Sequence, residues 1–431
     1  MIKMSESETK EKFPVKLAFF ISLAVFAQEI TWNFYDSQVP VSLLKYISSV
    51  AIVGLIMGLD NLLGLFIEPI IGKRSDNTRT RFGRRIPYIM VGIPVAAIFF
   101  ILIPFETSLL TLLIFILGYV TVMLLFKAPT ESLLPDFISE EHRSKANSIG
   151  KIMTSISIIV AALISLLVVD VNLQLAFIIS AIIMVLCLFI VLSTVKEKNS
   201  ISYQLILKEE ELSSTKDTQQ KKNITFRDTF RLIRKEKDKS TFIILLSVLL
   251  MSLAWSGLRA LLTPYAMEVY GLSRGTAGSL TLYGGIAFLI FAYPLSALAE
   301  KYGRFLFIKL GFTLIICSMV LGFLIQTLLM LIIAVILLSI GWSTLVINMI
   351  VIIWGKAPSS KEAGTYTGLY YFFYYGAAAF GPALLGLFTD LTSWYYLLLN
   401  AAIIYAIGFI LILFVKSEAP LEENVELKYI K

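Results

Sequence analysis

The sequence predicts an all-α integral membrane protein with twelve transmembrane helices arranged as two six-helix halves. Apolar runs of roughly 20 residues, the length that crosses a bilayer as a helix, recur along the whole chain. Of the 431 residues, 57% are hydrophobic and 16% are charged. Soluble domains contain about 45–50% apolar and about 25% charged residues, so a soluble fold is excluded.

The first half occupies residues 1–195. Its first 16 residues are polar, and the apolar run that follows is too long for a cleaved signal peptide, so we expect a retained first helix. Each later span is an apolar run bounded by polar or charged residues. The six expected spans are 16–38, 47–72, 86–105, 108–128, 145–169 and 173–195.

A charged segment at 196–240 separates the halves and is predicted to be a cytoplasmic central loop. Leu205–Leu212 and Phe226–Ile233 have the amphipathic spacing of helices that lie on a membrane surface, whereas a solvated linker is the alternative. The second half follows at 241–416, and 417–431 form a cytoplasmic tail. Its expected spans are 241–268, 275–299, 305–325, 327–353, 362–389 and 393–416.

The distribution of charge predicts that both termini are cytoplasmic. Lys and Arg gather in the even-numbered connections, beginning with Lys73–Arg85, and the odd-numbered ones carry little beyond Lys45 and Arg274. The net charge of +7 therefore reflects membrane topology and not nucleic-acid binding. With two separated cysteines, one histidine and no Walker loop or nucleophile elbow, we expect no enzyme, no cofactor and no metal site.

Several stretches resemble one superfamily of transporters. Residues 72–87 read G-x-x-S-D-x-x-x-x-R-x-G-R-R-x-P, and a shorter Gly-Arg turn recurs at 299–304 in the second half. Residues 32–40 (W-N-x-Y-D-x-x-V-P), 58–72 (G-L-D-N to P-I-I-G) and 129–147 (P-D to R-S-K-A-N) follow the same pattern. Together they are similar to major facilitator transporters, and most to the sucrose-transporter and melibiose-type (glycoside-pentoside-hexuronide) sugar:cation symporters. This resemblance implies the major facilitator fold.

Ionisable side chains inside apolar spans are the first functional candidates, because each costs about 2.5–3.5 kcal/mol at a helix centre. Asp60 lies near the middle of span two beside Asn61, and its face continues to Gly64 and Glu68. A carboxylate at this depth can bind a proton or a cation as its surroundings change; a structural buried carboxylate is the alternative. The resemblance places Glu68 at the second of two cation-site aspartates and Gly64 at the first. A single carboxylate there favours H+ over Na+, and a gating role for Glu68 opposite Arg79–Arg85 stays open.

Span one carries a polar face that suits a sugar. Glu29 shares this face with Trp32, Asn33 and Asp36, and Gln28 extends it. An aromatic ring can stack on the apolar face of a sugar while amide and carboxylate groups bind its hydroxyls. Glu29 is also a third candidate for proton coupling. The alternative for Trp32 is a place in the interfacial aromatic belt.

Arg259 is the positive charge that lies well inside the second half. We expect it to face the cavity and to pair with a carboxylate such as Glu29 or Asp60, or with the substrate. A permanent structural ion pair is the alternative. The remaining candidates for substrate contact are Asn61 in span two and, in second-half spans, Trp255, Tyr283, Asn348, Tyr370 and Tyr374.

The basic hairpin between spans two and three is predicted to act as a cytoplasmic gate. The resemblance gives it this role, in which guanidinium groups pair with carboxylates in one conformation and separate in another. The predicted gate residues are Asp76, Arg81, Gly83, Arg84, Arg85, Asp136 and Arg143.

The predicted function is therefore secondary active transport by alternating access. The expected process is symport of a sugar or glycoside, such as a disaccharide, with a proton, by a functional monomer in the cell membrane. An exporter or a carrier of another small solute on the same fold is one alternative. A membrane sensor that transports nothing is the other.

Overall fold

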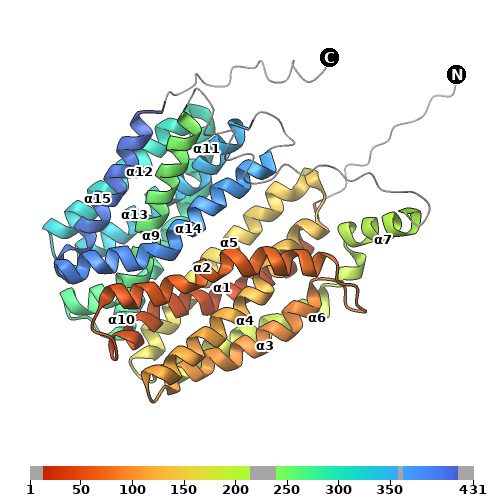
Figure 1. Cartoon of the computed structure of the whole chain (residues 1–431), viewed down its shortest axis with the longest axis horizontal. Coiled ribbons are helices and arrows are strands. Elements are labelled where there is room, and N and C mark those ends of the chain that lie inside the picture. Colours follow the sequence, from red (N-terminus) through yellow and green to blue (C-terminus); the bar gives the residue numbers. More distant parts are fainter. Residues whose placement is uncertain (1–12, 214–238, 358–362, 416–431) are drawn as a thin grey trace.

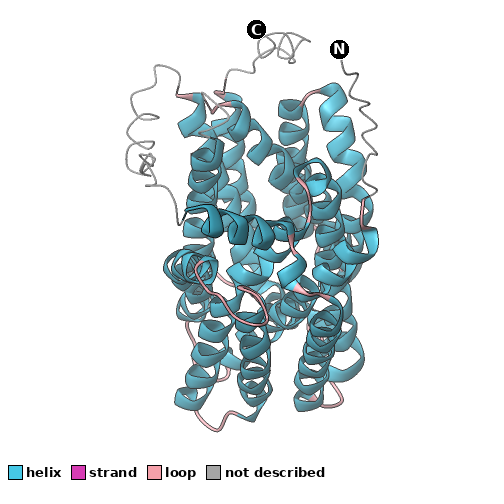
Figure 2. Ribbon diagram, turned by 90° about the vertical axis from the view of Figure 1, so that its right-hand side faces the viewer, coloured by secondary structure: helices cyan, strands magenta, loops and turns pink. Residues whose placement is uncertain are grey.

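Helices make up the regular structure of this protein. The computed structural model describes residues 13–213, 239–357 and 363–415. Within them, 12 helices are long and apolar enough to cross a membrane, which confirms the predicted fold class. Figure 2 shows these helices running side by side in roughly one direction.

The first half contains six membrane-length helices. A 3-10 turn at Ile103–Phe105 extends the third, and a π-helical turn at Ser165–Val169 extends the fifth. The short helix α7 (Ile201–Ser213) follows the sixth and includes the first amphipathic segment predicted from the sequence; the second, Phe226–Ile233, lies outside the described residues. The six helices are α1 (Val15–Leu44), α2 (Val50–Asp76), α3 (Ile86–Leu102), α4 (Leu109–Phe137), α5 (Arg143–Ile164) and α6 (Leu173–Thr194).

The second half repeats this count, with its second span divided between two helices. The short α10 (Arg274–Gly278) leads into α11 (Thr281–Tyr302), and together they form span eight. A 3-10 turn at Trp394–Tyr396 precedes the last helix. The other helices are α9 (Ser240–Tyr270), α12 (Arg304–Leu324), α13 (Leu328–Gly355), α14 (Ala363–Leu391) and α15 (Leu397–Leu413).

Helix α4 is longer than the sequence predicted. The expected span ends at residue 128, but the helix continues through Pro129 and Pro135 to Phe137. The hydroxyl of Thr130 donates to the carbonyl of Phe126 at 2.8 Å, one of the side-chain bonds that support a helix interrupted by proline. The extension moves residues 129–137 from a predicted connection into a helix.

The two halves form separate cores that meet along a few helices. One buried apolar cluster comes almost entirely from the first half and the other from the second. Between the halves, α14 packs against α2 and α5 packs against α11. Figure 1 shows the first half, in red to yellow, beside the second half, in green to blue.

The contact between α2 and α14 is unusually close. A Cβ atom on Gly54 would lie 2.1 Å from the carbonyl oxygen of Pro382, and one on Gly58 would lie 1.9 Å from that of Ala379. No side chain larger than hydrogen fits at either position without moving a backbone. Glycine therefore permits the two halves to touch backbone to backbone.

Candidate functional site

The two halves are joined by an ion pair between α9 and α1. Arg259 Nη2 lies 2.6 Å from Asp36 Oδ2 and donates a hydrogen bond to Asn33 Oδ1 at 3.0 Å. Asn33 in turn donates to Ser157 Oγ of α5 at 3.1 Å. The side chain of Arg259 is 35% exposed and that of Asp36 is 14% exposed, so water or a solute can reach the pair.

The carboxylate that pairs with Arg259 differs from the prediction. The sequence pointed to Glu29 or Asp60, whereas the structure gives Asp36, which lies two turns beyond Glu29 on the same face of α1. Both predicted partners remain within electrostatic range of Arg259. The predicted cluster of charge is therefore present, with a different direct contact.

Asp60 is buried between the helices of this region. It is 7% exposed, and one carboxylate oxygen accepts a hydrogen bond from the side-chain amide of Asn61 at 2.7 Å. Among the described residues, no Lys or Arg forms an ion pair with it. An ionised carboxylate buried in this way is costly, so binding a proton or a nearby cation would stabilise it.

Lys127 connects the halves a second time, and the sequence did not identify it as a site residue. Its ammonium group donates to Glu68 Oε1 at 2.7 Å and lies 5.0 Å from the ring centroid of Tyr375 on α14. Glu131 follows one turn later on α4. The predicted end of span four at 128 puts Lys127 at the boundary with a connection, whereas the structure places it well inside α4. Glu68 pairs with Lys127 here and not with the Arg79–Arg85 cluster.

Aromatic rings form two groups, one in each half, on or beside the helices that carry these charges. Trp255 and Trp342 are stacked with centroids 4.2 Å apart and planes within 5°, and Tyr374 lies 6.3 Å from Trp342. In the first half, Trp32 packs against Tyr119 at 5.8 Å. The sequence predicted Trp255, Tyr374 and Trp32 as candidates and missed Trp342, which has no charged residue near it in α13. Flat faces of this kind bind sugars and other rings.

Four of the predicted contact residues have other surroundings in this conformation. Asn348 is fully buried and accepts a hydrogen bond from Arg304 at 3.0 Å, so it fastens α12 to α13. Gln28 and Tyr370 are 2% and 1% exposed and lie within the bundles, not at an accessible surface. Tyr283 is 37% exposed. A direct contact with substrate in this conformation is therefore not supported for Asn348, Gln28 or Tyr370.

The basic hairpin forms the pairs that the sequence predicted. Arg84 Nη2 lies 2.7 Å from Asp136, and Arg85 reaches Asp76 at 2.5 Å and Asp136 at 3.3 Å. Both arginines are buried. These partners all belong to the first half, so the pairs fasten the hairpin to α2 and α4. Whether they open during transport stays a prediction.

A third carboxylate, Glu197, completes this network and was not identified from the sequence. It accepts hydrogen bonds from the backbone N–H groups of Arg85 at 2.8 Å and Ile86 at 2.9 Å. Gly83 has φ +115°, and a Cβ there would lie 2.4 Å from Glu197 Oε2. Burial raises the pKa of the Glu197 carboxyl, and the backbone donors act in the opposite direction. The need for glycine at position 83 thus has a steric cause, and its role in gating stays a prediction.

The remaining two predicted gate residues lie at the edges of this region. Arg81 is exposed, with its guanidinium 4.7 Å from the centroid of the Phe82 ring. Arg143 is exposed and begins α5. Their proposed part in gating stays a prediction.

On the opposite side of the membrane, where the odd-numbered connections lie, a carboxylate of α14 binds the beginning of α2. Asp390 accepts hydrogen bonds from the Ser49 hydroxyl at 2.6 Å, from Val50 N–H at 2.8 Å and from Ala51 N–H at 2.9 Å. Ser49 is also the N-cap of α2. The negative charge therefore sits at the positive end of a helix in the other half.

An equivalent contact joins the end of span five to the beginning of span eight. Asp170 accepts from the Ser273 hydroxyl at 2.5 Å and from Gly275 N–H at 2.7 Å, and Ser273 is the N-cap of α10. Span five corresponds to span eleven when the halves are compared in order, and span two corresponds to span eight. In both contacts, an aspartate of one half binds the N-terminus of a helix in the other half. The Asp390 and Asp170 contacts therefore hold the two halves together on this side.

This fold and the charged surface between its halves define a membrane transporter. The chain matches the Major Facilitator Superfamily over residues 21–382 and again over 244–429. It belongs to that superfamily, whose members are transporters of small solutes and not enzymes.

Solved structures of transporters share the fold at low sequence identity. The nucleoside transporter NupG is 12% identical with a TM-score of 0.74, covering 93% of this chain and 100% of that one. A bacterial homologue of the human lysosomal transporter Spinster, inward-facing and occupied, is 14% identical with a TM-score of 0.71, covering 93% and 96%. The peptide transporter POT in complex with sulfate is 14% identical with a TM-score of 0.65, covering 93% of each chain. No curated protein matches the sequence significantly.

Proposed function

We propose that this transporter is a proton-coupled symporter of a sugar or glycoside, such as a disaccharide. The observation that carries the proposal is the partly exposed pair of Arg259 and Asp36 between the halves, with the Asn33 amide bound to the same guanidinium. Amide, carboxylate and guanidinium groups bind hydroxyls. Trp255, one turn before Arg259 on α9 and stacked on the buried Trp342, supplies a flat apolar ring near them.

Proton coupling is assigned to the carboxylates of this region. Asp60 is buried without an ion pair among the described residues, so its charge depends on what binds it. Glu68 and Glu29 are the secondary candidates. The Lys127 ammonium, 2.7 Å from Glu68, already supplies the positive charge that a sodium ion would bring. This contact supports H+ over Na+ as the coupling ion.

Alternating access is supported by where the halves touch. The Asp390 and Asp170 contacts join them on the side of the odd-numbered connections, and the Arg259 pair joins them further in. Breaking the first two and closing the opposite side would expose the Arg259 region to the other compartment. The gathering of Lys and Arg in the even-numbered connections favours cytoplasmic termini. The protein proposed here works as a monomer in the plasma membrane. The sequence stretches at 32–40, 58–72, 72–87 and 129–147 favour the sucrose-transporter and melibiose-type branch.

A carrier or exporter of another solute with a flat ring is the second candidate. The face of Trp255 that Trp342 does not cover would accept such a ring as readily as a sugar. Structures with the same fold include a nucleoside transporter and a peptide transporter.

The test is uptake of labelled solutes into proteoliposomes, with and without an imposed inward proton gradient. The panel contains mono- and disaccharides, nucleosides and dipeptides, and a protonophore is the control. Gradient-dependent uptake of one sugar that stops with protonophore supports the proposal. Uptake of a nucleoside or peptide alone moves the protein to the second candidate. If no solute moves although the protein is folded and inserted, a sensor becomes the better interpretation.

A further inference from the structure

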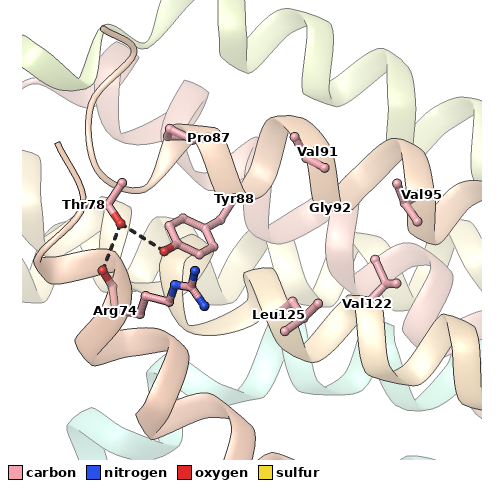
Figure 3. A pocket seen from close by; sticks show the side chains of 9 residues that line it. All are labelled: Arg74, Thr78, Pro87, Tyr88, Val91, Gly92, Val95, Val122 and Leu125. Carbon is pink, nitrogen blue, oxygen red and sulfur yellow. Dashed lines mark hydrogen bonds between the residues drawn. The ribbon is translucent and has the colours of Figure 1, made fainter. Parts of the chain in front are cut away.

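A groove with no role in the proposed transport cycle lies on the outer face of the first half. It has a volume of about 470 Å³ and runs between the end of α2, the first half of α3 and the middle of α4 (Figure 3). Its walls divide into a polar end at Arg74, Thr78 and Tyr88 and an apolar end that includes Val91 and Leu125. Val91 is 61% exposed, so the groove is open to the surface of the bundle.

The polar end presents an available guanidinium. Arg74 is exposed in the last turn of α2, and its side chain makes no hydrogen bond or ion pair with the described residues, although its carbonyl accepts from the Thr78 hydroxyl at 2.9 Å. The Thr78 and Tyr88 oxygens are 3.0 Å apart. Since the Thr78 proton goes to the Arg74 carbonyl, Tyr88 donates to Thr78 and its oxygen is free to accept. Figure 3 shows the Arg74 guanidinium beside the Tyr88 ring, directed into the groove.

The apolar end extends from this point toward the middle of the membrane. From Pro87 to Val95 the groove follows α3 for about 12 Å at 1.5 Å per residue. Its floor is shaped by Gly92, where a Cβ would lie 2.3 Å from the Phe126 ring. A larger residue at 92 would collide with the buried Phe126 ring and displace the wall of the groove. The groove therefore starts at the Arg74 guanidinium, near the end of the membrane-spanning helices, and continues among apolar side chains.

We propose that this groove binds an anionic phospholipid from the leaflet on the side of the termini. The planar fork of Arg74 matches a phosphate group, and the apolar channel accommodates the beginning of an acyl chain. The exposed side chains of Lys73 and Arg81 add positive potential around the same end, which favours an anionic headgroup over a zwitterionic one. The position of the guanidinium at a membrane interface makes a lipid, and not free phosphate, the occupant.

The experiment measures lipid binding to the purified full-length protein by native mass spectrometry during titration with phosphatidylglycerol or phosphatidylcholine. Arg74→Gln removes the cation, and Val91→Trp fills the apolar channel without changing charge. Lys301→Ala is the matched control, because Lys301 is an exposed cation at the corresponding turn of the second half. Each variant is first shown to have the melting temperature of the wild type, measured in lipid-free detergent.

We expect wild-type protein to bind phosphatidylglycerol more tightly than phosphatidylcholine. Arg74→Gln should weaken phosphatidylglycerol binding about fivefold, the effect of one basic residue at an anionic membrane surface. Val91→Trp should weaken both lipids, and Lys301→Ala should weaken neither. Unchanged phosphatidylglycerol binding in Arg74→Gln overturns the assignment. So does equal competition by inorganic phosphate or glycerol phosphate, since that outcome makes a free anion the ligand.

Discussion

Replacing Asp390 by asparagine should release the two halves on the side of the odd-numbered connections. The substitution keeps the shape of the side chain but removes the charge that faces the beginning of α2. The three donors, Ser49 hydroxyl and the N–H groups of Val50 and Ala51, then share one neutral carbonyl oxygen. Asp170→Asn makes the equivalent change at Ser273 and Gly275.

The size of the effect follows from the exposure of these contacts. Both aspartates are exposed, where a charge at a helix N-terminus contributes about 0.3–1 kcal/mol. Weakened charge-assisted hydrogen bonds bring the loss to about 1 kcal/mol per contact. The two contacts share no residue, so their effects should add to about 2 kcal/mol. In population terms, the state open on this side should rise about fivefold in each single variant and about 30-fold in the double variant.

Distances between spin labels measure this shift. Leu110→Cys in the first half and Leu329→Cys in the second, both exposed on this side, carry the labels in a background where Cys187 and Cys317 are serine. Double electron–electron resonance spectroscopy then gives the fraction of molecules with the longer distance between the two labels. Glu106→Gln is the control, because it removes a carboxylate that pairs with Lys45 inside the first half, at 3.2 Å. A distance distribution in the double variant that matches the wild type refutes the reasoning.

Three further predictions concern the site and the hairpin. Asp36→Asn and Arg259→Gln should each lower the melting temperature, and the double variant should be less destabilised than their sum by about 1–3 kcal/mol, since each single change leaves a charge unpaired; additive melting-temperature shifts contradict this. Asp60→Asn should abolish proton-driven accumulation while exchange of solute across the membrane continues; uphill uptake at the wild-type level removes Asp60 from coupling. Gly83→Ala should cost about 1–3 kcal/mol of stability, because φ is +115° and the Cβ meets Glu197. Gly303→Ala, at φ +104° with open space around it, should cost less in thermal unfolding, and equal losses would show that Glu197 does not matter.

The sequence was sufficient for the number and the approximate positions of the membrane-length helices, because the length of an apolar run depends only on local composition. The sequence was also sufficient to identify charged residues whose place inside an apolar span costs free energy. Asp60 and Arg259 could be singled out from the sequence alone, since a charge inside an apolar span needs a partner or a purpose. The arginine–carboxylate pairs of the hairpin were predictable for a similar reason. The sequence motifs contain both the arginines and the aspartates that pair with them.

What could not be predicted depends on contacts between helices far apart in the chain. The choice of Asp36 over Glu29 as the partner of Arg259 is set by the relative height of α1 and α9, which no local pattern records. Lys127 lies at the predicted end of span four, and the continuation of α4 through Pro129 and Pro135 is what places it inside a helix. Asp390 and Asp170 lie at ordinary helix ends, and only the packing of the two halves brings each to the beginning of a helix in the other half.

The bare contact of Gly54 and Gly58 with the α14 backbone has a mechanical consequence. The α2 side of this contact has no side chain at residues 54 and 58 that would have to move past α14, so one helix can tilt on the other without a large steric barrier. The contact lies near one end of α2, and the helix continues for 18 residues from Gly58 to Asp76, about 27 Å. A tilt of about 15° at this point would carry the far end through about 7 Å. The glycines therefore act as the fulcrum of a lever, turning a small rotation at one membrane surface into a wide displacement at the other.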